Sequence, residues 1–139
     1  MSETTLAVGT DLVYIPAFAE QLNTPGTRFA GVFHPLEMRV AATKTATGKE
    51  AHLAGRWAVK EAFIKAWSQT MYGRPPVIGE DAVDFAEIVV RPDAWGRIAI
   101  ELHGEVAAAF SRMPGDGADI AASISHDGDY ATATCVIRW

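Results

Sequence analysis

The stretch of sequence that decides the fold is Arg56-Trp-Ala-Val-Lys60-Glu61-Ala-Phe-Ile-Lys65-Ala66, because it places charges in what is otherwise a buried helix. The surrounding run, from about residue 51 to residue 68, is rich in alanine and contains no proline. It therefore predicts a long amphipathic helix. The large apolar residues of this run recur at helical spacing and share one face: Leu53, Trp57, Ile64, Trp67 and Met71.

Glu61 and Lys65, one helical turn apart, lie about a quarter turn away from this apolar face. Their side of the helix consists of small residues: Ala54, Gly55, Ala58 and Ala62. Small side chains allow another element to approach the helix backbone closely. We therefore expect the carboxylate and the ammonium in a tight seam. The alternative is an ordinary surface pair, which would contribute about 0.2–0.5 kcal/mol.

A second unusual charge is Asp11, at the centre of the apolar run Leu6-Ala-Val-Gly-Thr-Asp11-Leu-Val-Tyr-Ile15. The run predicts a strand that is buried on most of its surface. Asp11 shares one face of this strand with Ala7, Gly9, Val13 and Ile15. Because an unpaired buried carboxylate is costly, a cap, a salt bridge or a metal ion is expected beside it. In the last case Asp11 and Glu61 would meet around a hard cation such as magnesium, which takes only one or two protein carboxylates.

Three blocks of the sequence together resemble the holo-acyl-carrier-protein synthases, the small 4′-phosphopantetheinyl transferases. They are Val8-Gly-Thr-Asp11-Leu-Val, His52-Leu-Ala-Gly-Arg56-Trp-Ala-Val-Lys60-Glu61-Ala-Phe-Ile-Lys65-Ala66 and Ser123-Ile-Ser-His126-Asp127, in the family's order. The resemblance implies transfer of phosphopantetheine from coenzyme A to a serine of an acyl carrier protein in fatty acid biosynthesis, with release of adenosine 3′,5′-bisphosphate. It also implies magnesium, and a homotrimer with active sites between subunits.

The resemblance also implies roles for single residues. Asp11 and Glu61 would hold the magnesium ion, and the general base would be Glu61 or a water on the metal. Lys65 would stabilise charge on the transferring phosphate or protonate the leaving group. Coenzyme A is expected to contact Arg56, Trp57, Lys60, Lys65 and, from a neighbouring subunit, His126. For Lys60 a structural salt bridge is an equally open alternative.

The first short helix, expected at 16–22, departs from the family pattern. Many family members carry arginines there, suited to an acidic helix of a free carrier protein, whereas this segment has none. Either Arg28 and Arg39 substitute for them, or the partner is a carrier domain of a multidomain synthase that docks through apolar contacts. The expected docking residues are Phe18, Leu22 and Arg28.

Two other functions remain open. One is a non-catalytic module that binds coenzyme A or a nucleotide, and the other is a small acyl-CoA thioesterase. A thioesterase would need an activated water near a thioester and no metal at Asp11. The joint presence of Asp11, Glu61 and Lys65 favours the transferase, because a pure binder has no need for buried carboxylates facing an anionic ligand.

Length and composition fit one α+β domain over residues 1–139. The chain has 49% hydrophobic residues, enough for one compact core, and is too short for two ordinary domains. Its formal charge of −5 argues against nucleic acid or an anionic membrane as a partner. Cys135, the only cysteine, is expected in a core strand. With neither a signal pattern nor a run of about 20 apolar residues, a cytoplasmic protein is expected.

The remaining predicted elements mix helix and strand. Short helices are expected at 16–22, 28–32, 35–42 and 105–112, and strands at 85–91, 97–103, 120–125 and 130–137, the first two as a hairpin. Residues 43–49 are expected to form a polar loop, and Glu37 to favour a helix start. His34, His52 and His103 lack a metal-ligand spacing and are expected to be structural. This order predicts an α+β fold with a pseudo-symmetric sheet and a long central helix.

Overall fold

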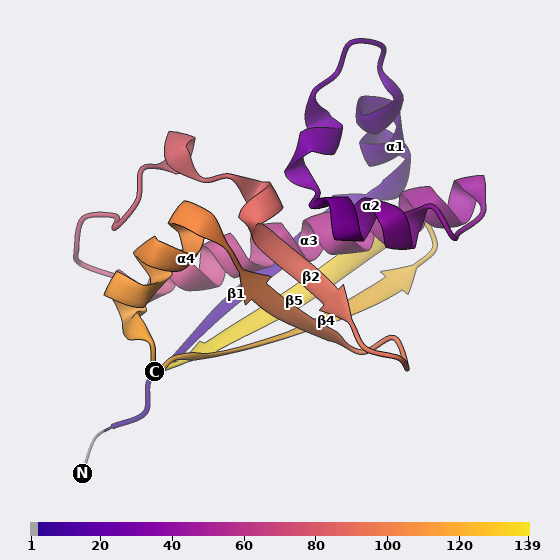
Figure 1. The fold of residues 1–139 in the computed structure, drawn as a ribbon. Coiled ribbons are helices and arrows are strands. Elements are labelled where there is room, and N and C mark those ends of the chain that lie inside the picture. Colours follow the sequence, from indigo (N-terminus) through magenta and orange to yellow (C-terminus); the bar gives the residue numbers. More distant parts are fainter. Residues whose placement is uncertain (1–2) are drawn as a thin grey trace.

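The long helix predicted from the sequence is the central element of the structure (Figure 1). The computed structural model describes residues 3–139, in which α3 spans Ala46–Thr70. The helix begins earlier than predicted because the Thr45 hydroxyl caps it, accepting a hydrogen bond from the Gly48 backbone N–H at 3.2 Å. The end of the expected polar loop at 43–49 is therefore helical.

The strands form two antiparallel sheets, whereas a single sheet was expected. The larger sheet has the order β1-β5-β4, with β1 at Leu6–Tyr14, β5 at Tyr130–Arg138 and β4 at Asp119–Asp127. The smaller sheet is the predicted hairpin of β2 at Ile88–Pro92 and β3 at Ile98–Leu102. Residues 85–87 form a 3-10 turn instead of strand, because the Asp84 carboxylate accepts a hydrogen bond from the Ala86 N–H at 3.0 Å.

The short helices lie close to their predicted positions. They are α1 at Ile15–Asn23, a 3-10 helix at Phe29–Val32, α2 at Pro35–Ala41 and α4 at Gly104–Phe110. A capping box starts α2, in which His34 Nδ1 accepts from the Leu36 N–H and Glu37 Oε1 accepts from the His34 N–H. Figure 1 shows the larger sheet on one side of α3 and helices α1 and α2 on the other. The α+β fold with a long central helix is thus confirmed.

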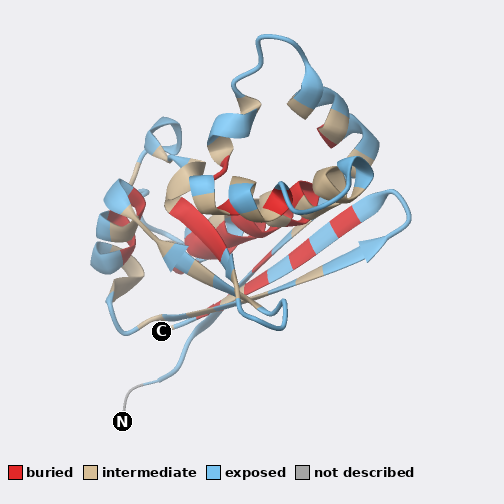
Figure 2. Cartoon of the chain, turned by 45° about the vertical axis from the view of Figure 1, so that its right-hand side comes forward, coloured by how far each residue is buried: buried red, intermediate tan, exposed pale blue. Residues whose placement is uncertain are grey.

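Strand β1 buries only one of its faces. Ala7, Gly9 and Val13 are buried, and Asp11 lies on the same face with a side chain that is 17% exposed. The other face carries exposed apolar side chains: Leu6, Val8, Leu12 and Tyr14. Figure 2 shows this alternation of buried and exposed residues along the larger sheet. Among residues 3–139 of one chain, no segment covers the second face, so the expectation of a strand buried on most of its surface is wrong there.

Strand β1 meets α3 backbone to backbone at Gly9. A Cβ atom at Gly9 would lie 2.0 Å from the Ala62 carbonyl oxygen and 2.5 Å from the Ala66 nitrogen. Ala58, Ala62 and Ala66 are fully buried along this seam. The predicted close approach along the small residues is confirmed, and it fixes the position of Asp11, two residues further along the strand. The expectation that the Lys65 ammonium is enclosed in this seam is wrong, because the Lys65 side chain is 55% exposed.

The hydrophobic core fills the space around α3. Trp67 of the helix is its largest buried side chain, and further fully buried apolar side chains come from the helix, the hairpin, α4 and the larger sheet: Leu53, Phe63, Ile88, Val106 and Ile137. Cys135 lies buried in β5, as predicted, and burial raises the pKa of its thiol to about 12. Within residues 3–139, no helix has both the length and the apolar character that crossing a membrane requires.

The seam predicts that Gly9→Ala destabilises the fold by about 3 kcal/mol, because the added methyl group meets backbone atoms that cannot rotate away. Urea unfolding followed by circular dichroism measures the loss. Gly31→Ala is the matched control, since a Cβ atom at Gly31 has no heavy atom within 4 Å. Equal stability of the two variants would contradict the close approach.

Candidate active site

The structure brings Asp11 of β1 together with Glu61 and Lys65 of α3. Lys65 Nζ donates to Asp11 Oδ1 at 3.2 Å and to the Thr10 carbonyl oxygen at 2.9 Å. Burial raises the pKa of the Glu61 carboxyl above its ordinary value. The neighbouring Asp11 raises this pKa further, and Lys65 partly offsets the increase. Two carboxylates therefore lie near enough at the β1–α3 seam to influence each other's charge, with one ammonium beside them.

The chemistry of this pair fits a hard divalent cation. Magnesium prefers oxygen ligands and binds through one or two carboxylates, with waters and substrate phosphates completing its shell. In the described part of the chain, no group of three or more His, Cys, Asp or Glu side chains could hold a metal. A site with only Asp11 and Glu61 thus suits magnesium better than a metal that needs a full set of protein ligands.

A second group of cationic side chains lies nearer the N-terminus of α3. Arg56 and His126 line a recess of about 370 Å³ together with residues 96–97 of the β2–β3 turn, Ile98 of β3 and residues 122–124 of β4. Burial lowers the pKa of the Arg56 guanidinium, and the negative charge of Glu37 opposes this change. The His126 Nε2 atom lies 3.0 Å from the Ala51 carbonyl oxygen. Within one chain, His126 therefore lies beside the turns of α3 that precede Glu61.

His52, which was expected to be structural, belongs to the same region. Its pKa is lowered to about 4, first by burial and then by the positive charges of Arg56, Lys44 and His126. Its Nε2 atom is buried and has no hydrogen-bond partner among the described residues. The sequence offered one signal, since His52 precedes Arg56 by a single helical turn. The concentration of positive charge suits a phosphate group.

Lys60 is fully buried and serves a structural role. Its ammonium donates to Glu37 Oε1 at 2.8 Å, to the Phe85 carbonyl at 2.9 Å and to the Ile88 carbonyl at 2.6 Å. Glu37 Oε2 also accepts from the Val90 N–H at 2.9 Å. All three N–H donors of Lys60 are thereby used, which corrects the expectation that Lys60 reaches a phosphate. The structural salt bridge is the alternative that the structure supports.

Aromatic side chains pack over the outer side of α3. The ring of Trp57, which is half-buried, lies 5.2 Å from that of Phe29 and 4.9 Å from that of Phe85, centre to centre. Phe18 packs against Phe29 and Phe33 and is only 4% exposed. Phe18 therefore cannot act as an exposed docking anchor, and that expectation is wrong. Phe18 and Leu22 lie one turn apart on the expected helix, and an apolar face of this kind can cover either the core or a partner.

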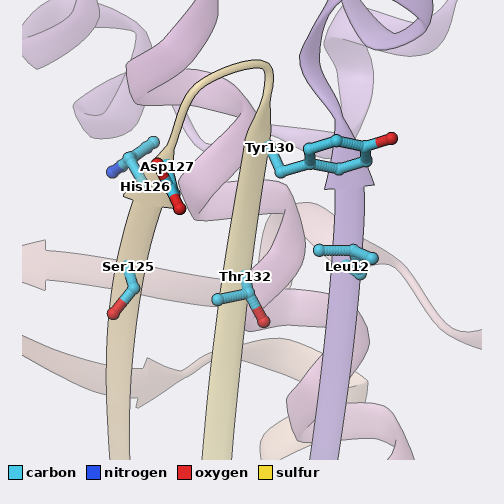
Figure 3. Close-up of a pocket in the computed structure, with 6 residues that line it drawn as sticks. All are labelled: Leu12, Ser125, His126, Asp127, Tyr130 and Thr132. Carbon is cyan, nitrogen blue, oxygen red and sulfur yellow. The ribbon is translucent and has the colours of Figure 1, made fainter.

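A second recess lies on the uncovered face of the larger sheet, near the β4–β5 turn (Figure 3). It has a volume of about 360 Å³ and is lined by Leu12, Ser125, His126, Asp127, Tyr130 and Thr132. His126 lines both recesses. It therefore stands at the edge between the cationic region and the uncovered sheet face.

Comparisons with known proteins identify the family of the chain. The family model of the 4′-phosphopantetheinyl transferase superfamily matches residues 7–135. A holo-[acyl-carrier-protein] synthase of Corynebacterium glutamicum is 57% identical over 132 residues, which cover 95% of this chain and 97% of the relative. A holo-[acyl-carrier-protein] synthase of Mycobacterium ulcerans is 43% identical over 133 residues, 96% of each chain.

Solved structures give the same result. The ACPS–CoA complex of Chronobacterium ammoniagenes matches with a TM-score of 0.94 and 61% identity, covering 97% of this chain and 98% of that one. The acyl carrier protein synthase of Mycobacterium tuberculosis matches with a TM-score of 0.71 and 36% identity, covering 94% and 95%. The chain belongs to the 4′-phosphopantetheinyl transferase superfamily. Within it, the similarity is to holo-acyl-carrier-protein synthases, which confirms the resemblance seen in the sequence.

The raised pKa of Glu61 predicts a pH-dependent effect of Glu61→Gln on stability. Ionised Glu61 is disfavoured in the folded state, so its ionisation opposes folding above its folded pKa and has no effect below its unfolded pKa. With a chelator present, Glu61→Gln should melt at a higher temperature than the parent chain at pH 7. This advantage in melting temperature should shrink as the pH falls towards the ordinary pKa of a glutamate.

Thermal melts between pH 4 and pH 8 measure this difference. The control is Glu20→Gln, which changes an exposed carboxylate on α1. An advantage of Glu61→Gln that stays constant over the range, or a loss of stability at pH 7, would contradict the account of Glu61.

The buried pair predicts that Lys60→Met destabilises the chain by about 3–5 kcal/mol, because Glu37 is left buried without its counter-charge. The double variant Lys60→Met/Glu37→Gln should recover about half of that loss, since neither charge remains. Urea unfolding of the two single variants and the double variant gives the coupling. Losses that simply add would show that the two side chains do not stabilise each other.

Proposed function

We infer that the chain transfers 4′-phosphopantetheine from coenzyme A to a serine of an apo acyl carrier protein, releasing adenosine 3′,5′-bisphosphate, in fatty acid biosynthesis. The observation that carries this conclusion is the meeting of Asp11, Glu61 and Lys65 at the seam, in a chain of this superfamily. A binding module would have no use for two facing carboxylates beside an anionic ligand. A thioesterase would not need a cation site.

The proposed reaction is an in-line displacement at the β-phosphorus of coenzyme A. The serine oxygen forms the new P–O bond, the bond to the bridging diphosphate oxygen breaks, and the bisphosphate leaves with that oxygen. Magnesium, when bound by Asp11 and Glu61, would neutralise charge on the diphosphate oxygens. Lys65, with its exposed ammonium, contributes positive charge to the transferring phosphate. Glu61 is the proposed acceptor of the serine proton, because it is a carboxylate one helical turn from Lys65, beside the expected phosphate.

The cationic region is proposed to hold the nucleotide end of coenzyme A. Arg56 and His126 share one recess. Burial, and after it the positive charges of Arg56, Lys44 and His126, lower the pKa of the nearby His52 to about 4. A guanidinium and an imidazole at the rim of a recess are suitable donors for a phosphate. The ring of Trp57 already packs against Phe29 and Phe85. Its contact with the nucleotide stays a prediction.

A homotrimer is proposed from the uncovered face of the larger sheet. The exposed fractions of Leu6, Val8 and Leu12 are 62%, 54% and 65%, and these residues follow one another along one side of β1. A row of apolar side chains on a sheet face is typical of a surface buried by a partner. His126 borders this face, so a second chain placed there would bring it near a neighbouring site.

The carrier is proposed to dock beside α1 and the loop that follows it. Leu22 is half-buried and Arg28 is exposed, so both can contribute to this surface, whereas Phe18 cannot. One apolar and one basic residue suit a carrier whose serine is flanked by both apolar and acidic side chains. The proposed partner is a free carrier protein or a carrier domain of a larger synthase.

The function predicts that Asp11→Ala and Glu61→Ala each lower the transfer rate by at least about 100-fold, because each removes a ligand of the cation. The assay combines the chain, coenzyme A, magnesium and an apo carrier protein, and mass spectrometry detects phosphopantetheine on the carrier serine. Lys49→Ala, which changes a lysine at the start of α3, is the control. Undiminished transfer by either variant, or transfer that persists in a chelator, would refute the shared cation site.

The trimer predicts complementation between inactive variants. Glu61→Ala and His126→Ala are each expected to lose activity, and mixed trimers should regain part of it where an interface combines both intact residues. Activity is measured after subunit exchange that native mass spectrometry has demonstrated. A monomer at assay concentration, or no recovery after full exchange, would show that each site is built within one chain.

A further inference from the structure

Lys65 makes a contact that the proposed transfer does not require. Its ammonium lies on Asp11 Oδ1 and on the Thr10 carbonyl of β1, although phosphate is its expected partner in the reaction. The Lys65 side chain is 55% exposed and the Asp11 side chain is 17% exposed. Two polar contacts therefore hold an ammonium whose stem is largely in solvent. Such a contact can be exchanged for another at little cost.

The contact also balances the charge of the carboxylate pair. Lys65 Nζ lies 3.2 Å from Asp11 Oδ1, and Lys65 is one helical turn from Glu61, so its positive charge stands beside both carboxylates. A divalent cation on the same two carboxylates would provide the same compensation more strongly. Two cations at one carboxylate oxygen repel each other, so Lys65 and the metal are expected to compete for Asp11.

We propose that Lys65 is an internal counter-ion, which pairs with Asp11 until a divalent cation binds and then leaves Asp11 for the phosphate. This inference rests on the proposed function, but its own claim concerns cation affinity without coenzyme A. The displaced ammonium stays within reach of the reaction because Lys65 lies one helical turn from Glu61. Binding of the cation thereby releases Lys65 to contact the transferring phosphate.

The proposal predicts an order of cation affinity among three chains. Lys65→Met should bind a divalent cation about two- to fivefold more tightly than the parent chain, since the competing ammonium is gone. Lys65→Arg keeps the charge but presents a planar fork that can hold a carboxylate through two hydrogen bonds. It should therefore bind the cation more weakly than the parent chain. Long-range repulsion alone would make the arginine variant and the parent chain equal.

The experiment titrates each chain with Mn²⁺ in the absence of coenzyme A and follows the loss of the free-ion signal by electron paramagnetic resonance. Lys49→Met removes the same charge from the start of α3 and should leave the affinity unchanged. Glu61→Ala identifies the signal that belongs to this site. Circular dichroism confirms folding, and Lys65→Gln replaces the methionine variant if that variant unfolds.

The expected result is the order Lys65→Met, parent chain, Lys65→Arg, from tightest to weakest. A methionine variant that binds no more tightly than the parent chain overturns the proposal, as does an arginine variant that binds equally well or better. If the order fails while magnesium-dependent transfer persists, only the counter-ion role is wrong. If the parent chain binds no Mn²⁺ through Glu61, the cation site of the proposed function fails as well.

Discussion

The close approach of β1 to α3 at Gly9 is the constraint on which the rest of the structure depends. With only 2.0 Å between a hypothetical Cβ atom and the Ala62 carbonyl oxygen, the strand can cross the helix in this position only with glycine. Two residues later, Asp11 reaches the turn of α3 that carries Glu61 and Lys65. The small residues thus determine the distance between the two elements, and that distance brings the charged residues together. Packing and chemistry share one seam.

Two lysines on α3 illustrate how position decides role. Lys60 is buried, and its three donors are taken by Glu37 and two carbonyl groups, so it ties α2 and the β2 hairpin to the helix. Lys65, just over one turn later, is 55% exposed and makes an exchangeable contact with Asp11. The first lysine holds the scaffold rigid, because a buried charge without its partner is costly. The second keeps the freedom that a group needs to meet a substrate.

Local sequence patterns predicted the helices and strands. They did not predict ion pairs between residues that are far apart in the sequence. Helical periodicity predicted α3, and the small residues predicted its close contact with β1. Both could be predicted because each pattern is formed by residues a few positions apart in the sequence. Glu37, the ion-pair partner of Lys60, is 23 residues away in the sequence. In the sequence it resembled an ordinary acidic residue in the first turn of a helix. Phe18 was misplaced because the apolar face that it shares with Leu22 can cover either the core or a partner, and the sequence of the helix does not distinguish the two. The exposed face of β1 was misjudged because its sequence is that of a strand covered on both sides, while one chain covers only one.

The position of the bound cation tests the two-carboxylate site most directly. Crystals of the chain soaked in Mn²⁺ and measured near the manganese absorption edge would locate the ion by its anomalous scattering. The predicted result is a single strong peak within bonding distance of carboxylate oxygens of both Asp11 and Glu61, about 2.0–2.2 Å for a hard cation of this size. A peak elsewhere, or one that contacts neither carboxylate, would contradict the assignment of the β1–α3 seam as the catalytic centre.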